Sequence, residues 1–325
     1  MKQKQKKAFG YAKYGYIFSI PFVVIFLFFS LYPTIFTAVL GFTDSKGLGN
    51  TNFNFLANPF QNFTTILNNQ SFRLSLNNTI TIWLMNFIPQ VLLALLLTEW
   101  FTNSTNKIKG TGFFKVAYYL PNIITAASIA ILFNSLFGYP MGPVNDLFKM
   151  LGLSESPIYF LTSKATSRGI VAFIQFWMWY GYTMIILISG VLGISPEIFE
   201  AANVDGASRF QTFFLITIPN LKTILLYMVI TSMIGGLQMF DIPRLFMNGG
   251  PDNSTLTTSL FIYNQAFSGS YLYNRASAAS MIMFVIISLA SAVVFFLMRD
   301  KEEALAYKQQ RALIKREKQA RRQGA

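Results

Sequence analysis

The residues best placed to do chemistry gather in one polar stretch, residues 195–211, in the middle of a very apolar chain. Glu200 and Asp205 place fixed negative charge there, and the small residues Ala201, Ala202 and Gly206 allow another surface to approach closely. Charge and small side chains at these offsets favour docking to another protein over reaction with a small molecule. A plain connector between two apolar segments is the alternative, and from local physics alone the two have about equal weight.

Helix signals surround these residues. Ser195 stands at a cap position, Pro196 suits the first helical position, and Glu197 complements the positive helix end. The pair 205–206 predicts a turn, and a second helical run is expected from Ala207 until Pro219 interrupts it. We therefore predict helix, turn and helix between two long apolar segments.

A second set of candidate residues consists of amides and aromatic rings inside the apolar segments. Such side chains suit a neutral polyol, because rings stack on sugar C–H faces and amides bond to hydroxyls, although amides also join membrane helices and Trp and Tyr favour membrane interfaces. Substrate contact and ordinary helix packing therefore both remain open for each of these residues. The set is Asn86, Gln90, Gln175, Trp177, Trp179, Tyr182 and Gln238.

Other chemistry is excluded by what the sequence lacks. There is no cysteine and no histidine, so disulfides, thiol nucleophiles, histidine bases and the commonest zinc ligands are excluded. No G-x-x-x-x-G-K-[ST] loop is present, so the chain does not hydrolyse ATP by that route. No charged residue lies deep in an apolar run, which argues against proton- or sodium-driven transport.

The elements that position these residues are membrane helices. The 325 residues are 53% hydrophobic and 12% charged, with a mean hydropathy of +0.44, and a soluble domain carries about twice that charge. Six uncharged runs are long enough to cross a bilayer. They are residues 14–43, 74–98, 116–145, 169–196, 223–240 and 276–298. The third and fourth exceed one span, so their ends belong to loops, and Gly235-Gly236 in the fifth favours close packing over an unwound point.

Charge distribution predicts the orientation. With both termini in the cytoplasm, 19 of the 26 Lys and Arg residues lie inside and 7 outside. The residue 195–219 loop then lies in the cytoplasm. The first run is too long for a signal peptide and has no small-residue cleavage site, so we interpret it as an uncleaved span. The net charge of +13 resides mainly at the chain ends, residues 1–13 and 299–325, which favours anionic lipid over nucleic acid as the partner.

The order of residues in the polar stretch resembles a known family. Glu200-Ala201-Ala202, Asp205-Gly206-Ala207 and the later Pro219 resemble the EAA loop of binding-protein-dependent ABC importer permeases. In that family the loop is the cytoplasmic coupling helix that docks in a cleft of the ATP-hydrolysing subunit. The resemblance makes docking the stronger interpretation and implies coupling roles for Glu200, Ala201, Ala202, Asp205 and Gly206.

Further segments extend the resemblance to sugar-type permeases over most of the chain. Residues 113–121 resemble the entry to the third span, and 238–241 and 248–251 resemble the QxFD and GGP segments of the maltose and oligosaccharide class. Pro243-Arg244 departs from the expected apolar pair, and the first 70 residues match only as a hydrophobic anchor.

The resemblance implies an all-α integral membrane protein with six transmembrane helices (residues 14–298) and a coupling helix between the fourth and fifth. It implies a permease subunit in the bacterial plasma membrane that is not itself catalytic, with ATP and Mg²⁺ bound by two partner ATPase subunits. A second homologous permease, expected to be a different chain, and an extracellular solute-binding protein complete the complex, which imports an oligosaccharide.

Two alternatives remain at this stage. A related permease carries another small solute such as glycerol phosphate, although an anion needs a basic group in the path. A membrane scaffold or channel without energy coupling has no reason to carry the pattern from Glu200 to Pro219. An enzyme is the weakest alternative, because no acid–base pair or ligand set converges in the sequence.

Overall fold

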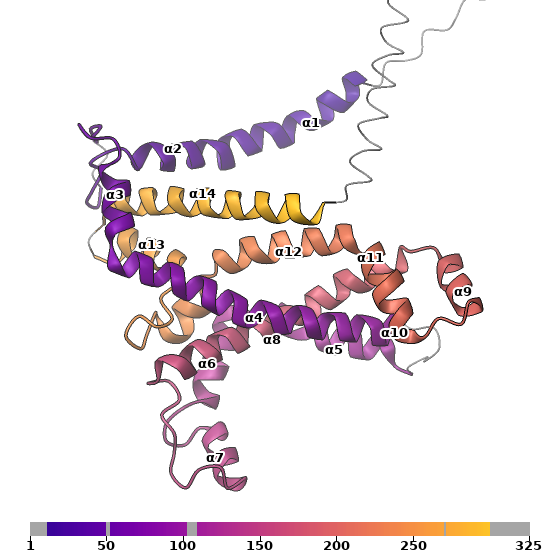
Figure 1. Cartoon of the computed structure of the whole chain (residues 1–325). Coiled ribbons are helices and arrows are strands. Elements are labelled where there is room, and N and C mark those ends of the chain that lie inside the picture. The colour runs from indigo at the N-terminus through magenta and orange to yellow at the C-terminus, as the bar shows by residue number, and fades with distance from the viewer. Residues whose placement is uncertain (1–11, 50–52, 103–108, 270, 300–325) are drawn as a thin grey trace, which may run out of the picture. The chain divides into compact units, whose positions relative to one another are not determined.

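The computed structural model describes residues 12–49, 53–102, 109–269 and 271–299, and their regular elements are helices (Figure 1). The basic tail expected beyond residue 299 lies outside the described residues. In chain order the α-helices are α1 (Ala12–Phe26), α2 (Tyr32–Leu40), α3 (Gln61–Asn68), α4 (Gln70–Thr102), α5 (Thr111–Ile123), α6 (Ala126–Leu136), α7 (Pro143–Met150), α8 (Lys164–Leu192), α9 (Pro196–Val204), α10 (Arg209–Gln211), α11 (Ile218–Asn220), α12 (Lys222–Leu237), α13 (Thr258–Phe267) and α14 (Tyr273–Met298). Three wider π-helical turns, Leu27–Leu31, Thr212–Thr217 and Pro243–Met247, are inserted between them.

The chain forms two compact units. The first comprises residues 1–69 and 262–282, and the second comprises residues 70–261 and 283–325. In the first unit, the buried Asn62 amide donates hydrogen bonds of 2.9 Å to the carbonyls of Gly41 and Thr43, and its oxygen accepts one from Asn274. One amide side chain thus closes the loop after α2 and ties it to the start of α14.

The second unit is built around α4 and α8, which pack along much of their lengths. Their shared core includes Ile82 and Ala94 from α4 and Ile174, Met184 and Leu187 from α8, none of them more than marginally exposed. Gly181 of α8 allows α5 to approach, because a Cβ atom there would lie 1.9 Å from the Tyr118 carbonyl oxygen. These three helices form the frame that holds the remaining segments of the unit.

Long-range polar contacts fix the loop before α13 onto this frame. The Asn78 amide donates to the carbonyls of Asn253 (2.7 Å) and Leu256 (3.0 Å), and its oxygen accepts from Arg168 (2.7 Å). Arg168 also donates to the Ser254 carbonyl at 2.8 Å. The loop that contains the GGP sequence is therefore held by side chains of α4 and α8.

Four helices are long and apolar enough to cross a membrane: Tyr14–Leu40, Gln70–Thr102, Lys164–Leu192 and Tyr273–Met298. Two further candidates are bent pairs, α5 with α6 at 93° and the Arg209–Asn220 segment with α12 at 69°. The described residues thus contain four candidate spans, or six if each bent pair counts as one, at the places where the six uncharged runs occur.

The first bend has a local cause, and the second lies two residues after Pro219. At the first, Ile124 is extended and Thr125 caps α6 by accepting from the Ser128 amide at 3.3 Å. At the second, the prediction that Pro219 interrupts the helix is wrong, because the helical path continues to Asn220 and breaks at Leu221. The π-helical turn over Thr212–Thr217 precedes the proline and changes the hydrogen-bond register, so the missing proline amide does not end the helix there.

Candidate functional site

The polar stretch folds into a short helix that projects beyond the ends of α4 and α12 (Figure 1). Helix α9 begins with Pro196 at its first position and carries Glu197 in its first turn, as predicted. Ser195 occupies the cap position, but its side chain makes no capping hydrogen bond. The helix start therefore depends on the proline and the dipole rather than on the serine hydroxyl.

The predicted turn ends α9 with a Schellman motif. Gly206 has φ +73°, its amide donates to Asn203 (3.2 Å), and the Ala207 amide donates to Ala202 (2.9 Å). This pair of bonds with a left-handed glycine is the usual way to satisfy the last carbonyls of a helix. Gly206 thus fixes the angle at which the chain leaves α9.

The second helical run begins at Arg209 rather than at Ala207. Ser208 accepts from the Gln211 amide, and the Gln211 side chain accepts from the Ser208 amide at 2.8 Å, which forms a capping box. The box was missed in the sequence although Ser208 and Gln211 have its spacing. It sets the position of Arg209 at the first helical residue.

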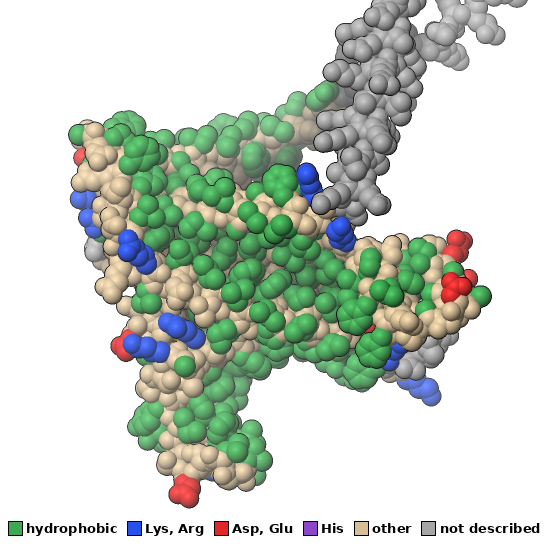
Figure 2. All heavy atoms as spheres, in the orientation of Figure 1, with side chains coloured by type: hydrophobic (Ala, Val, Ile, Leu, Met, Phe, Trp, Pro, Cys, Tyr) green, Lys and Arg blue, Asp and Glu red, His purple; other side chains and the backbone are tan. Residues whose placement is uncertain are grey.

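Four of the five predicted docking residues, Glu200, Ala201, Asp205 and Gly206, are exposed, whereas Ala202 is buried. Figure 2 shows acidic side chains gathered on the projecting helix. On the opposite side of α9, Phe199 packs against the core cluster that contains Val191 and Leu221. The helix therefore has one face attached to the bundle and another face free for a partner.

A charged pair joins the segment after α9 to α4. The Arg209 guanidinium donates through Nε and Nη2 to the two carboxylate oxygens of Glu99, near the end of α4. Both oxygens of the carboxylate are thus engaged by one guanidinium, which makes this a charge-assisted, oriented pair. Glu99 was not among the predicted residues, because nothing in the sequence relates positions so far apart.

A cleft of about 370 Å³ lies between α9, α10 and the ends of α4 and α8. It is lined by both members of the pair and by the exposed Glu200 and Asn203 of α9.

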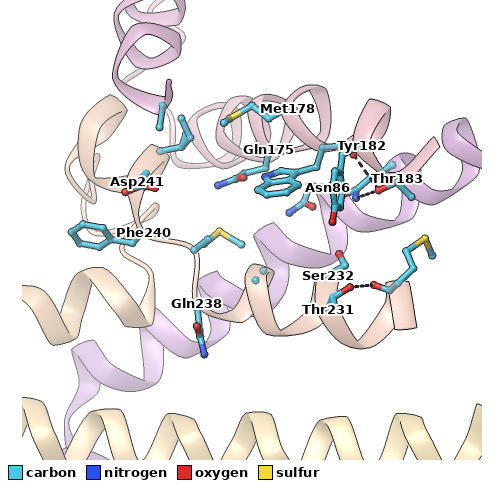
Figure 3. Close-up of a pocket in the computed structure, with 18 of the residues that line it drawn as sticks. Asn86, Gln175, Met178, Tyr182, Thr183, Thr231, Ser232, Gln238, Phe240 and Asp241 are labelled. Atoms are coloured by element: carbon cyan, nitrogen blue, oxygen red, sulfur yellow. Dashed lines mark hydrogen bonds between the residues drawn. The ribbon is translucent and has the colours of Figure 1, made fainter. Parts of the chain in front are cut away.

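A cavity of about 350 Å³ lies inside the second unit, between α4, α8 and α12. Six of the seven predicted polar and aromatic residues line it, namely Asn86, Gln90, Gln175, Trp179, Tyr182 and Gln238. Figure 3 shows Asn86, Gln175 and Tyr182 grouped on the side of α4 and α8, with Gln238 and Asp241 on the segment that follows α12. Three stretches that are distant in sequence, from α4, α8 and α12 with the residues after it, thus meet around one space.

Two of the amides are held by neighbours in the wall. Gln90 donates to the Thr183 hydroxyl at 2.7 Å, and Asn86 donates to the Ile82 carbonyl at 2.9 Å. Both residues are nearly buried, at 4% and 5% exposure. One N–H of each amide is engaged and its position fixed, so the amide oxygens and the second N–H of Asn86 and Gln90 are the groups that a ligand can use.

Trp177 does not line the cavity. Its ring packs edge-on against Phe133 at 5.7 Å, among the residues that cover the core. Trp177 and Trp179 are two positions apart, so they leave α8 in different directions. The aromatic pattern in the sequence gave no means to tell which of the two faces inward.

The two adjacent glycines of α12 have different roles. A Cβ atom on Gly236 would lie 2.0 Å from the Trp83 ring, whereas one on Gly235 would meet nothing within 4 Å. The expected close packing is therefore present at Gly236, and Gly235 borders the cavity.

Several lining residues were missed in the sequence. Met228, Thr231, Ser232 and Gly235 form one helical face of α12, a spacing that could have identified them. Among the described residues, Asp241 is the only acidic one in the lining, and neither Lys nor Arg lines the cavity. The wall offers hydrogen-bond acceptors, hydroxyls and rings, without positive charge.

Comparison with known proteins shows which family the chain belongs to. The family model described as "Binding-protein-dependent transport system inner membrane component" matches residues 15–301. The lactose transport system permease protein LacF of Rhizobium radiobacter is 30% identical over 89% of this chain and 95% of its own length. The arabinooligosaccharides transport system permease protein AraP of Bacillus subtilis is 30% identical over 86% of each chain.

Solved structures show the same fold. The crystal structure of a bacterial ABC transporter involved in the import of the acidic polysaccharide alginate contains a chain with a TM-score of 0.74 and 23% identity, covering 87% of this chain and 94% of that one. The same transporter in complex with an alginate pentasaccharide-bound periplasmic protein gives a TM-score of 0.72.

Proposed function

The chain belongs to the family of binding-protein-dependent transport system inner membrane components, and from this premise we propose that it forms the carbohydrate path of an ABC importer. It is a multi-pass permease subunit of the bacterial plasma membrane. The observation that carries the carbohydrate assignment is the cavity, whose amides, hydroxyls and aromatic rings match the groups of a sugar.

In this proposal the cavity residues divide the recognition between them. Trp179 and Tyr182, both exposed to the cavity, stack on the C–H faces of the sugar, and Asn86, Gln90 and Gln175 bond to hydroxyls. The exposed carboxylate of Asp241 accepts from two neighbouring hydroxyls, a charge-assisted contact stronger than that of an amide. A volume of about 350 Å³ lies at the lower end of the range for small-ligand pockets.

The absence of Lys and Arg from the lining, together with Asp241, favours a neutral substrate. A phosphate or a uronate would be repelled by the Asp241 carboxylate, and no cation among the described lining residues offsets that repulsion. The glycerol phosphate alternative is therefore the weaker one for this cavity, and the acidic substrate named for the alginate transporter is not proposed for this chain.

The residue 195–219 loop is proposed to dock onto a partner ATPase. Glu200 and Ala201 offer an exposed contact face on α9, Ala202 seats the helix on the bundle, and Asp205 and Gly206 set the turn that follows. Two ATPase subunits bind ATP and Mg²⁺, a second permease (a different chain) completes the path, and an extracellular binding protein delivers the sugar. This chain performs no catalysis in the scheme.

We propose six spans within residues 14–298, each bent pair forming one span, with residues 1–13 and 299–325 in the cytoplasm. Support comes from the four long helices, the two bent pairs and the distribution of Lys and Arg. The same orientation places α9 on the cytoplasmic side, where the ATPase subunits lie.

Purification from the native membrane in mild detergent, followed by mass spectrometry, tests the complex. An ATPase subunit and a second six-span permease are the expected companions. Recovery of this chain alone, under conditions that keep other importers whole, would overturn the importer assignment in favour of a scaffold or channel.

Uptake into proteoliposomes tests the substrate. The complete complex with its binding protein should take up a neutral di- or oligosaccharide in an ATP-dependent manner and should not take up glycerol phosphate. Asp241→Asn should lower the uptake efficiency about tenfold, because a hydrogen bond to a charged group contributes roughly 1.5–3 kcal/mol. Unchanged uptake in this variant would remove Asp241 from the binding site.

A further inference from the structure

The ion pair between Glu99 and Arg209 has no role in the function proposed so far. Helix α4 carries two charged residues, Arg73 near its start and Glu99 near its end. The Glu99 side chain is 19% exposed, so most of it is withdrawn from water. Withdrawing a carboxylate from water costs free energy unless a cation pairs with it. The contact with Arg209 therefore stabilises the Glu99 carboxylate at this place.

The geometry of the pair is that of a rigid joint. Two guanidinium nitrogens contact two carboxylate oxygens, an arrangement that fixes orientation as well as distance. Arg209 is itself fixed, because the capping box of Ser208 and Gln211 holds it at the first position of α10. The Schellman motif at Gly206 then connects Arg209 to α9 through a short, fully bonded turn.

On the other side of the joint, α4 leads to the cavity. Gln90 is nine residues before Glu99, a distance of roughly 14 Å along a helix, and Asn86 is about one turn further. Gln90 also bonds to Thr183 of α8 at 2.7 Å, so a displacement of α4 reaches a second wall of the cavity. Pro89 lies between these two residues and cannot donate to the Met85 carbonyl, which leaves the helix least restrained at that point.

We propose that the Glu99–Arg209 pair is the tether through which movement of α9 is passed to α4 and so to the cavity wall. Both are positioning residues that act through α4 and contact no substrate. The proposal rests on the proposed function, because it assumes that a partner moves α9. It differs from that function in placing the connection at one side-chain pair rather than in the apolar packing of Phe199 and Leu221.

The test is the coupling ratio, sugar molecules taken up per ATP hydrolysed, in proteoliposomes that contain the complete complex. Glu99→Gln and Arg209→Gln should each lower this ratio about fivefold or more, a typical size for coupling between sites. The exchanged pair, Glu99→Arg with Arg209→Glu, should restore it to within about twofold of wild type. A structural role alone would lower the melting temperature without changing the ratio in the complexes that remain.

Lys164→Gln is the matched control. It removes the exposed ion pair with Asp252 at the opposite end of α8, where the side chains are 61% and 77% exposed, and should leave the ratio unchanged. The tether is overturned if both single variants keep the wild-type ratio, or if the exchanged pair is no better than they are.

Cross-linking covers the case in which the single variants fail to assemble. The chain has no cysteine, so Glu99→Cys with Arg209→Cys gives one specific site for a short thiol cross-linker. A linked complex that still transports supports a tether that stays closed through the cycle. Loss of transport on linking, reversed with a cleavable reagent, overturns it.

These outcomes are separable from failure of the proposed function. A wild-type complex without ATP-dependent sugar uptake would overturn the importer assignment and the tether together. Equal coupling ratios in an active wild type and in all variants would overturn the tether alone.

Discussion

The loop at residues 195–221 and the cavity differ in how they are built. The loop is assembled from neighbours in sequence: a proline start, a glycine turn and a capping box within about twenty residues. The cavity is assembled from α4, α8, α12 and the segment after α12, whose residues are up to 156 positions apart, from Asn86 to Ile242. A short helix and its turns can thus be encoded by neighbours in sequence, whereas the wall of a cavity depends on how distant helices pack.

The largest effect on uptake is expected at Gly206, whose left-handed conformation ends α9. Gly206→Pro should lower ATP-dependent uptake about tenfold or more, because proline requires φ near −65° and has no amide for the bond to Asn203. Gly206→Asn should keep most of the uptake, since asparagine tolerates the left-handed conformation. Substrate-stimulated ATP hydrolysis at the wild-type level in the proline variant would contradict a coupling role, as would the same result for Glu200→Lys.

The two tryptophans of α8 test whether the cavity binds the sugar, because one faces the cavity and the other packs on the core. Trp179→Ala should raise the KM for uptake about tenfold and leave the melting temperature nearly unchanged, because its ring faces the cavity and is 42% exposed. Trp177→Ala should lower the melting temperature and leave the KM for uptake nearly unchanged, because its ring packs against Phe133 in the core. Melting in detergent and initial uptake rates separate the two, and identical behaviour would mean that the cavity does not bind the sugar.

The adjacent glycines of α12 test whether helix packing maintains the cavity. Gly236→Ala should lower the melting temperature by about 5 °C, because the new methyl group meets the Trp83 ring and overpacking costs roughly 1–3 kcal/mol. Gly235→Ala should change it by less than about 2 °C, since the methyl group enters open space. Equal shifts would show that α4 and α12 can separate without cost.

The two serines of the loop give the smallest expected effect. Ser208→Ala should cost about 1 kcal/mol of local stability, because the capping box is lost. Ser195→Ala should cost almost nothing, since that hydroxyl makes no capping bond. Amide hydrogen exchange over residues 195–221 measures both, and greater exchange in the Ser195 variant would reverse our account of how α9 starts.

The local features could be predicted from the residues alone. Uncharged runs predicted where the membrane helices lie, and Pro196 and Gly206 predicted the start and end of α9, because each depends on the conformation of single residues and on helix ends. The second helical start and the effect of Pro219 were predicted wrongly, because they depend on a capping box and on a π-helical turn that simple periodicity does not reveal.

Tertiary structure decided which of these residues meet. It turned Trp179 into the cavity and Trp177 into the core, assigned close packing to Gly236 and open space to Gly235, and brought Glu99 to Arg209. The physical reason is that an apolar helix satisfies its own backbone and can present any face to a neighbour. The choice among faces is therefore made by packing between helices, which no segment of the chain carries alone.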